Sequence, residues 1–111
     1  MIELTVKEFL EQRLPVPVYM EFPQNPELQF VVLRKTDSTR ENRVDSAKLV
    51  ADSYAESLYE AALLNEQIKN TLDALTELPE ICSSDRVTDY PFIDTKNKRY
   101  RYQAVQSVTH Y

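Results

Sequence analysis

Glycine is absent from this sequence of 111 residues. Proteins on average contain about 7% glycine, which supplies positive φ angles and lets ligands approach the backbone closely. Glycine-rich phosphate loops, the dinucleotide-binding fingerprint and the nucleophile elbow all need glycine at fixed positions. The sequence therefore excludes these three kinds of site, and it predicts turns made by proline, asparagine, aspartate and serine.

Cysteine and histidine each occur once. The lone Cys82 has no intrachain disulfide partner, and this pattern suits a reducing compartment. A nucleophilic cysteine needs a histidine base, and the single His110 is the penultimate residue. We therefore expect Cys82 to be a small buried hydrophobic residue.

Long apolar runs are also missing, and about 20 such residues are needed for a membrane-spanning helix. The first residues lack the basic flank and apolar stretch of a signal peptide. These absences predict a soluble, cytoplasmically synthesised protein with no membrane partner.

The charge is acidic, because 13 Lys and Arg residues stand against 18 Asp and Glu residues, giving a formal net charge of −5. Such a surface repels phosphate backbones, so we expect no specific binding of nucleic acid. A local basic cluster near the C-terminus is the exception. We expect it to be a solvated strand face or a subunit contact, with nucleic-acid binding as the alternative. It consists of Lys96, Lys98, Arg99 and Arg101.

The length is typical of one domain, here residues 1–111. Apolar residues at helical spacing predict a first helix over residues 6–13 and a long second helix that reaches Leu75. Capping boxes place the two starts, with Thr5 and Glu8 at the first helix and Ser53 and Glu56 at the second.

Five strands are predicted from alternating or continuous apolar residues, and they cover 16–22, 28–33, 43–52, 81–87 and 99–111. Pro15 and Pro17 place the first strand at a sheet edge. Residues 35–42 are predicted to be a hairpin loop, and residues 89–97 a turn-rich connection. The order is helix, three strands, helix, two strands. This order predicts an α+β fold with a mixed, mostly antiparallel sheet of about five strands and both helices on one face.

Two carboxylate pairs have spacings that metal sites use. Glu56 and Glu60 lack the histidine of a di-metal bundle site, so a solvated helix face explains them. Asp85 and Asp89 lack the glycine and the glutamate of a calcium loop. We therefore expect no catalytic residue, no cofactor and no metal, and we expect that the protein is not an enzyme.

Two groups of residues are candidates for partner binding. Arg40, Glu41, Asn42 and Arg43 end a charged segment that has no apolar residue, and arginine grips carboxylates with two parallel donors. The alternative is a solvated hairpin tip. Tyr100 and Tyr102 on the last strand form the second group, because tyrosine is enriched in interfaces. Ordinary half-buried sheet packing is the alternative for them.

Three segments carry a resemblance to a known family: VPVYMEFP at 16–23, SYAESLYEAALLNEQIKNTLDAL at 53–75 and DTKNKRYRYQAVQSV at 94–108. Over nearly its whole length the chain resembles the tail-terminator, or tail-completion, proteins of siphophages and prophages of Gram-positive bacteria. The resemblance implies a mixed α/β sheet with helices against one face. It brings no catalytic residue with it.

The resemblance also implies a function. Members of that family are structural virion proteins that form a hexameric ring, cap the tail tube, end its elongation and provide the surface for head joining. The partners implied are other copies of the chain, the tail-tube protein and the head-connector or neck protein. The implied location is the host cytoplasm during assembly and then the head-proximal end of the tail. A head-completion or neck protein and a nonviral protein-binding module are the alternatives.

Overall fold

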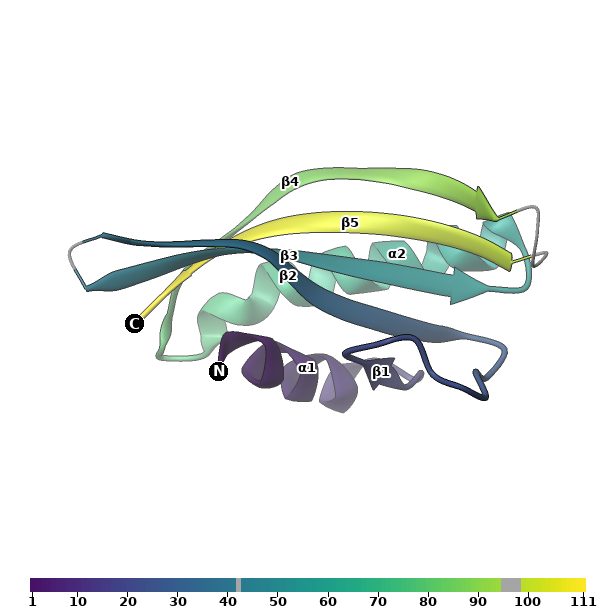
Figure 1. The fold of residues 1–111 in the computed structure, drawn as a ribbon, viewed down its shortest axis with the longest axis horizontal. Coiled ribbons are helices and arrows are strands. Elements are labelled where there is room, and N and C mark those ends of the chain that lie inside the picture. The colour runs from purple at the N-terminus through teal and green to yellow at the C-terminus, as the bar shows by residue number, and fades with distance from the viewer. Residues whose placement is uncertain (42, 95–98) are drawn as a thin grey trace.

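A computed structural model describes residues 1–41, 43–94 and 99–111 of the chain. The elements follow the predicted order of helix, three strands, helix and two strands, with a 3-10 turn after the second helix (Figure 1). They are α1 (Ile2–Arg13), β1 (Val18–Tyr19), β2 (Phe30–Glu41), β3 (Val44–Ala55), α2 (Leu58–Asp73), η1 (Ala74–Glu77), β4 (Ile81–Asp94) and β5 (Arg99–His110).

The five strands form one sheet in the order β1-β2-β3-β5-β4. β1 runs parallel to β2, and every other neighbouring pair is antiparallel. The predicted α+β class, with a mixed and mostly antiparallel sheet, is thereby confirmed. Two long hairpins, β2–β3 and β4–β5, make up most of the sheet and give the molecule a length of 45 Å.

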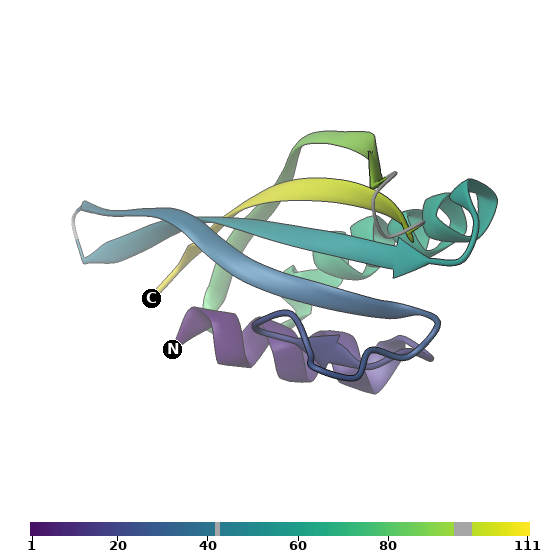
Figure 2. The ribbon, with the colours of Figure 1, turned by 45° about the vertical axis from the view of Figure 1, so that its right-hand side comes forward.

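Both helices cover the same face of the sheet (Figures 1 and 2). α2 packs on β3, β4 and β5, whereas α1 packs on β1, β2 and α2. Apolar side chains from both helices and from alternate strand positions form the main core, among them Leu10, Leu33, Leu49, Ile68 and Leu72. Burial of such side chains contributes about 1.5–3 kcal/mol each, which holds the two helices against the sheet.

The opposite face of the sheet carries a small aromatic cluster. Phe30 and Tyr54 stack with ring centroids 4.7 Å apart and an interplanar angle of 7°. Phe22, from the segment after β1, meets both rings edge to face. This cluster covers only one end of that face.

Both predicted helix starts are wrong. α1 begins at Ile2, and Thr5 lies inside it, where its Oγ1 donates to the carbonyl of Met1. Ser53 belongs to β3, which continues through Ala55 because it still pairs with β5 there. The cap of α2 is Ser57, whose side chain accepts a hydrogen bond from the backbone N–H of Glu60.

Strand lengths also differ from the predictions. The first strand is confined to Val18–Tyr19, although its edge position is confirmed. The region predicted as a turn from residue 89 belongs to β4 as far as Asp94, and residues 95–98 lie outside the described part. Pro91 is compatible with β4 because β4 is an edge strand, where a missing N–H leaves no neighbour unpaired.

The predicted hairpin loop over residues 35–42 is the largest error. β2 continues as far as Glu41 and pairs with β3 up to Val44, with one bulge between Lys35 and Asp37. The outer part of this hairpin extends beyond β1, which pairs only with Val31 and Val32. We call its apical residues Arg40, Glu41 and Arg43 the ribbon tip; Asn42, between them, lies outside the described residues.

Candidate functional site

The ribbon tip contains three of the predicted partner-binding residues. Arg40 is opposite Asp45 in the strand register, and its Nη1 lies 3.7 Å from Asp45 Oδ1. The Arg40 side chain is 67% exposed, so this ion pair contributes little to stability. Glu41 is exposed and is opposite Val44.

Arg43 differs from the other charged residues of the tip. Its φ is 67°, in the left-handed region that non-glycine residues adopt at a cost of about 1–2 kcal/mol. Two-residue hairpin turns require this conformation, and glycine is the residue that meets it without strain. Within residues 1–41, 43–94 and 99–111, Arg43 makes no hydrogen bond and no ion pair. Its guanidinium is therefore a solvated cation at the apex of the hairpin, with no bonding partner among the described residues.

Tyr100 and Tyr102 lie at the other end of the sheet. They are half-buried and stand opposite Ala55 and Ser53 of β3, at the end of that strand away from the tip. A strand of 12 residues such as β3 spans about 36 Å. The structure therefore does not join the two predicted groups into one site; it separates them by most of the length of the molecule.

Tyr102 belongs to a surface hollow of about 210 Å³ between α2 and β4. We call it the α2–β4 hollow, and its lining includes Tyr59, Leu63, Asn65, Glu66, Asp89 and Tyr102. Tyr59 and Leu63 are 73% and 49% exposed. Aromatic and aliphatic side chains thus stand beside two carboxylates and an amide.

Hydrogen bonds hold the polar side of this hollow. Asp89 Oδ2 accepts from Asn65 Nδ2 and from Lys69 Nζ, both at 2.9 Å, and Lys69 Nζ lies 2.7 Å from Glu66 Oε1. The hydrogen bond from Lys69 lowers the pKa of Asp89. The hydrogen bonds that Lys69 makes with Glu66 and Asp89 raise the pKa of Lys69. Asp89 and Lys69 are therefore both charged at neutral pH. Asn65 Oδ1 is buried with no partner among the described residues.

The hollow was not predicted from the sequence, because the second helix was expected to have only one apolar side. Tyr59 and Leu63 are four residues apart and lie outside the buried face of α2, which comprises Ala61, Leu64, Asn65, Ile68 and Leu72. A second apolar pair at i, i+4 spacing on a helix is the signal that would have indicated it.

Larger open hollows lie elsewhere. One of about 540 Å³ lies between the start of α1 and the β2–β3 hairpin, and another of about 770 Å³ adjoins β1. The first is crossed by Lys35 and Glu3, whose charged atoms are 3.6 Å apart. It mixes charges of both signs, so no ligand class follows from its lining.

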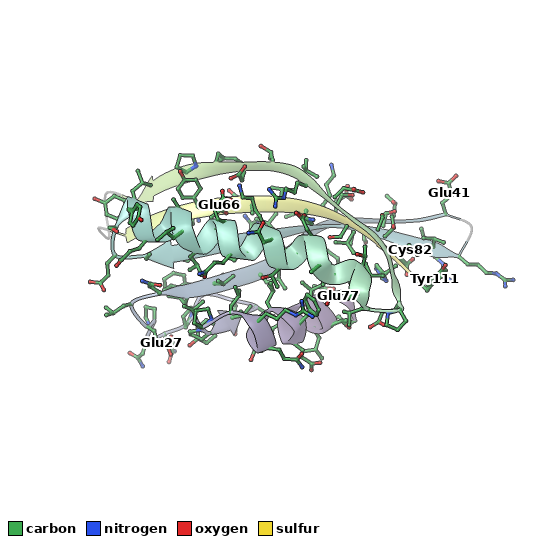
Figure 3. The ribbon with its side chains drawn as sticks, turned by 180° about the vertical axis from the view of Figure 1, so that it is seen from behind. Glu27, Glu41, Glu66, Glu77, Cys82 and Tyr111 are labelled. Carbon is green, nitrogen blue, oxygen red and sulfur yellow. The ribbon has the colours of Figure 1, made fainter. Side chains whose placement is uncertain are left out.

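The carboxylate pairs have ordinary structural surroundings. Asp85 is opposite Ser107 and Asp89 opposite Ala104, so the two aspartates face opposite sides of the sheet. In the part of the chain that the structure describes, no three His, Cys, Asp or Glu side chains gather as a metal site would need. Cys82 is exposed, which corrects the prediction of burial, and its hydrogen bond to Tyr111 raises the pKa of that tyrosine (Figure 3).

Neither the protein-family models nor the curated proteins include a match for this chain. Among the described helices, none has the length and apolar character that crossing a membrane requires.

Proposed function

We propose that this chain is a structural virion protein of a phage or prophage that acts as a tail terminator. In this role it caps the tail tube, ends its elongation and offers the surface to which the head joins. One observation carries the proposal beyond the sequence resemblance. The two candidate contact surfaces, the ribbon tip and the α2–β4 hollow with Tyr102, differ in chemistry and lie at opposite ends of an elongated molecule.

Symmetry links this arrangement to a ring. A two-fold dimer uses the same patch on both copies, whereas a head-to-tail contact uses two different patches and closes into a ring when the rotation permits. A charged tip at one end and an aromatic hollow at the other favour the head-to-tail contact. The resemblance supplies the number six for the ring.

The partners in this proposal are further copies of the chain, the tail-tube protein and the head-connector protein. The chain performs no reaction, and it moves from the host cytoplasm to the head-proximal end of the tail. Ring closure then depends on the tail tip as a template, so the isolated chain is monomeric or weakly associated at low concentration.

Electron microscopy of particles from a prophage lacking this gene tests the proposal. Overlong, headless tails are expected, and the intact gene supplied in trans should restore normal particles. Tailless or leaking heads would instead assign the chain to head completion. Normal particles would contradict a virion role and favour a nonviral protein-binding module.

A further inference from the structure

We propose that Arg43 of one copy binds in the α2–β4 hollow of the next copy, so that the guanidinium meets Glu66 and Asp89 and stacks beside Tyr59 and Tyr102. This inference rests on the head-to-tail assembly proposed above, and it names the contact that makes it. Figure 3 labels Glu41, in the ribbon tip at one end of the molecule, and Glu66, which lies far from it on α2. A second copy must therefore supply the arginine.

The charge of the hollow favours a cation. Two carboxylates of its lining, Glu66 and Asp89, share one cation, Lys69, at 2.7 and 2.9 Å. Two negative charges against one positive charge leave one negative charge without a cation at the hollow. One arginine from outside would balance it.

The walls of the hollow favour arginine in particular. Arginine stacks its planar guanidinium on aromatic rings and donates to carboxylates in a fork, whereas lysine is a strongly hydrated point charge. The hollow, about 210 Å³, is smaller than the roughly 300 Å³ at which small-molecule sites begin. It therefore suits a single long side chain. Asn65, whose Oδ1 is buried with no partner among the described residues, also lines the hollow.

Arg43 is the arginine of the tip that is available for this contact. Arg40 already faces Asp45 in its own hairpin. Arg43 has no such partner among the described residues, and it occupies a left-handed position where glycine would relieve strain. Arginine at this position is unfavourable for the turn, and its side chain has no partner among the described residues of its own chain. Binding of this side chain to another copy would explain its presence.

Disulfide trapping between two full-length variants tests the contact, with Cys82→Ser in both because Cys82 is exposed. One variant carries Glu41→Cys beside an intact Arg43. The other carries Gln67→Cys, an exposed position of α2 next to Glu66 that does not line the hollow. A size tag on one variant identifies the mixed dimer on a non-reducing gel. The matched control pairs Glu41→Cys with Leu28→Cys in place of Gln67→Cys. Leu28 is 68% exposed and lies between β1 and β2, at the other edge of the sheet.

The pair with Gln67→Cys should cross-link several-fold more than the control pair, and adding Arg43→Ser should remove the difference. At high protein concentration, where weak contacts form, equal cross-linking of both pairs, or none, would overturn the inference, as would insensitivity to Arg43→Ser. A charge exchange gives a second readout. Arg43→Glu should abolish the preference, and Glu66→Arg in the other copy should restore part of it. The trapping uses purified protein and is therefore independent of phage assembly. Normal particles from the prophage that lacks this gene would contradict the proposed function without affecting the cross-linking result.

Discussion

Gln106 of β5 donates from Nε2 to Asp73 Oδ1, at the last residue of α2, over 3.0 Å. The same nitrogen lies 3.0 Å from Ser84 Oγ on β4, and Arg86 Nε donates to the other Asp73 oxygen at 2.8 Å. Gln106 is almost fully buried, so its amide depends on these partners. One side chain thus fixes the end of α2 to β4 and β5, the two strands that contribute residues to the hollow.

Gln106→Glu should strongly destabilise the fold. It keeps the shape of the side chain but places a buried carboxylate against Asp73 and removes the donor. We expect a loss of more than about 2 kcal/mol in the free energy of unfolding, measured by urea denaturation at neutral pH. Arg86→Gln is the control, since its side chain is 44% exposed and exposed ion pairs contribute about 0–1 kcal/mol. Equal effects of the two changes would contradict this assignment.

Asp73→Asn should reduce stability at neutral pH and matter less in acid. Burial by itself would raise the pKa of Asp73, but hydrogen bonds from Arg86 and Gln106 outweigh it and lower the pKa below the ordinary 3.8. The ionised carboxylate therefore stabilises the fold above the unfolded pKa, and this contribution is lost as the pH falls through the folded pKa. Because Asp73 is 40% exposed, we expect a difference of about 0–1 kcal/mol, narrowing with acid, in denaturation at several pH values. A difference that widens in acid would reverse this interpretation.

Asp52→Asn should have the opposite effect on stability at neutral pH from Asp73→Asn. Asp52 is buried on the open face of the sheet, and burial raises its pKa against the opposing charges of Arg101 and Arg34. With the folded pKa above the unfolded one, the ionised form opposes folding at neutral pH, and that penalty disappears as the pH falls through the folded pKa. The variant should therefore be as stable as the natural chain or more stable at neutral pH, with the advantage vanishing in acid. Thermal denaturation across pH measures this, and a clear loss at neutral pH would show that the pairing with arginine prevails.

Ser57→Ala should cost about 1 kcal/mol, because it removes the side-chain acceptor for the N–H of Glu60 at the start of α2. The matched variant Thr5→Ala removes a hydroxyl from a partly buried position inside α1, and it should change stability by no more than about 0.5 kcal/mol. Urea denaturation of both variants tests whether Ser57 caps α2 and whether Thr5 lies inside α1 without a capping role. A loss of about 1 kcal/mol for Thr5→Ala would instead make Thr5 the cap of α1, as the sequence pattern predicted.

Apolar periodicity was sufficient for the fold class, because each helix and each central strand segment buries one face. It failed where a strand has two exposed faces. Residues 36–41 show no apolar alternation, since this part of β2 is exposed and is held mainly by its ladder with β3. Backbone hydrogen bonds to a neighbouring strand impose no pattern of apolar and polar side chains on the sequence. The capping signals failed for a related reason: Ser53 and Ser57 are both followed three residues later by glutamate, and only the length of β3 decides between them.

The candidate site was predictable in part. Charge without apolar content marked Arg40 and Arg43, and interface propensity marked Tyr102. Their positions at opposite ends of the sheet follow from the register in which β3 pairs with β2 and with β5. That register could not be predicted from the sequence. The α2–β4 hollow brings together residues from α2, β4 and β5, so only the fold assembles it.

Arg43→Gly should separate folding from assembly. Glycine adopts the left-handed conformation freely, so the variant should be at least as stable as the natural chain, with a gain of up to about 1 kcal/mol in thermal denaturation. The same change removes the guanidinium that we place in the next copy, so tails should lose length control when this variant is the only copy present. Arg43→Lys is the control: it keeps the charge and the backbone strain but loses the planar fork, and it should support assembly only in part. A glycine variant that is well folded and gives normal tails would show that Arg43 serves only the turn and makes no contact that assembly needs.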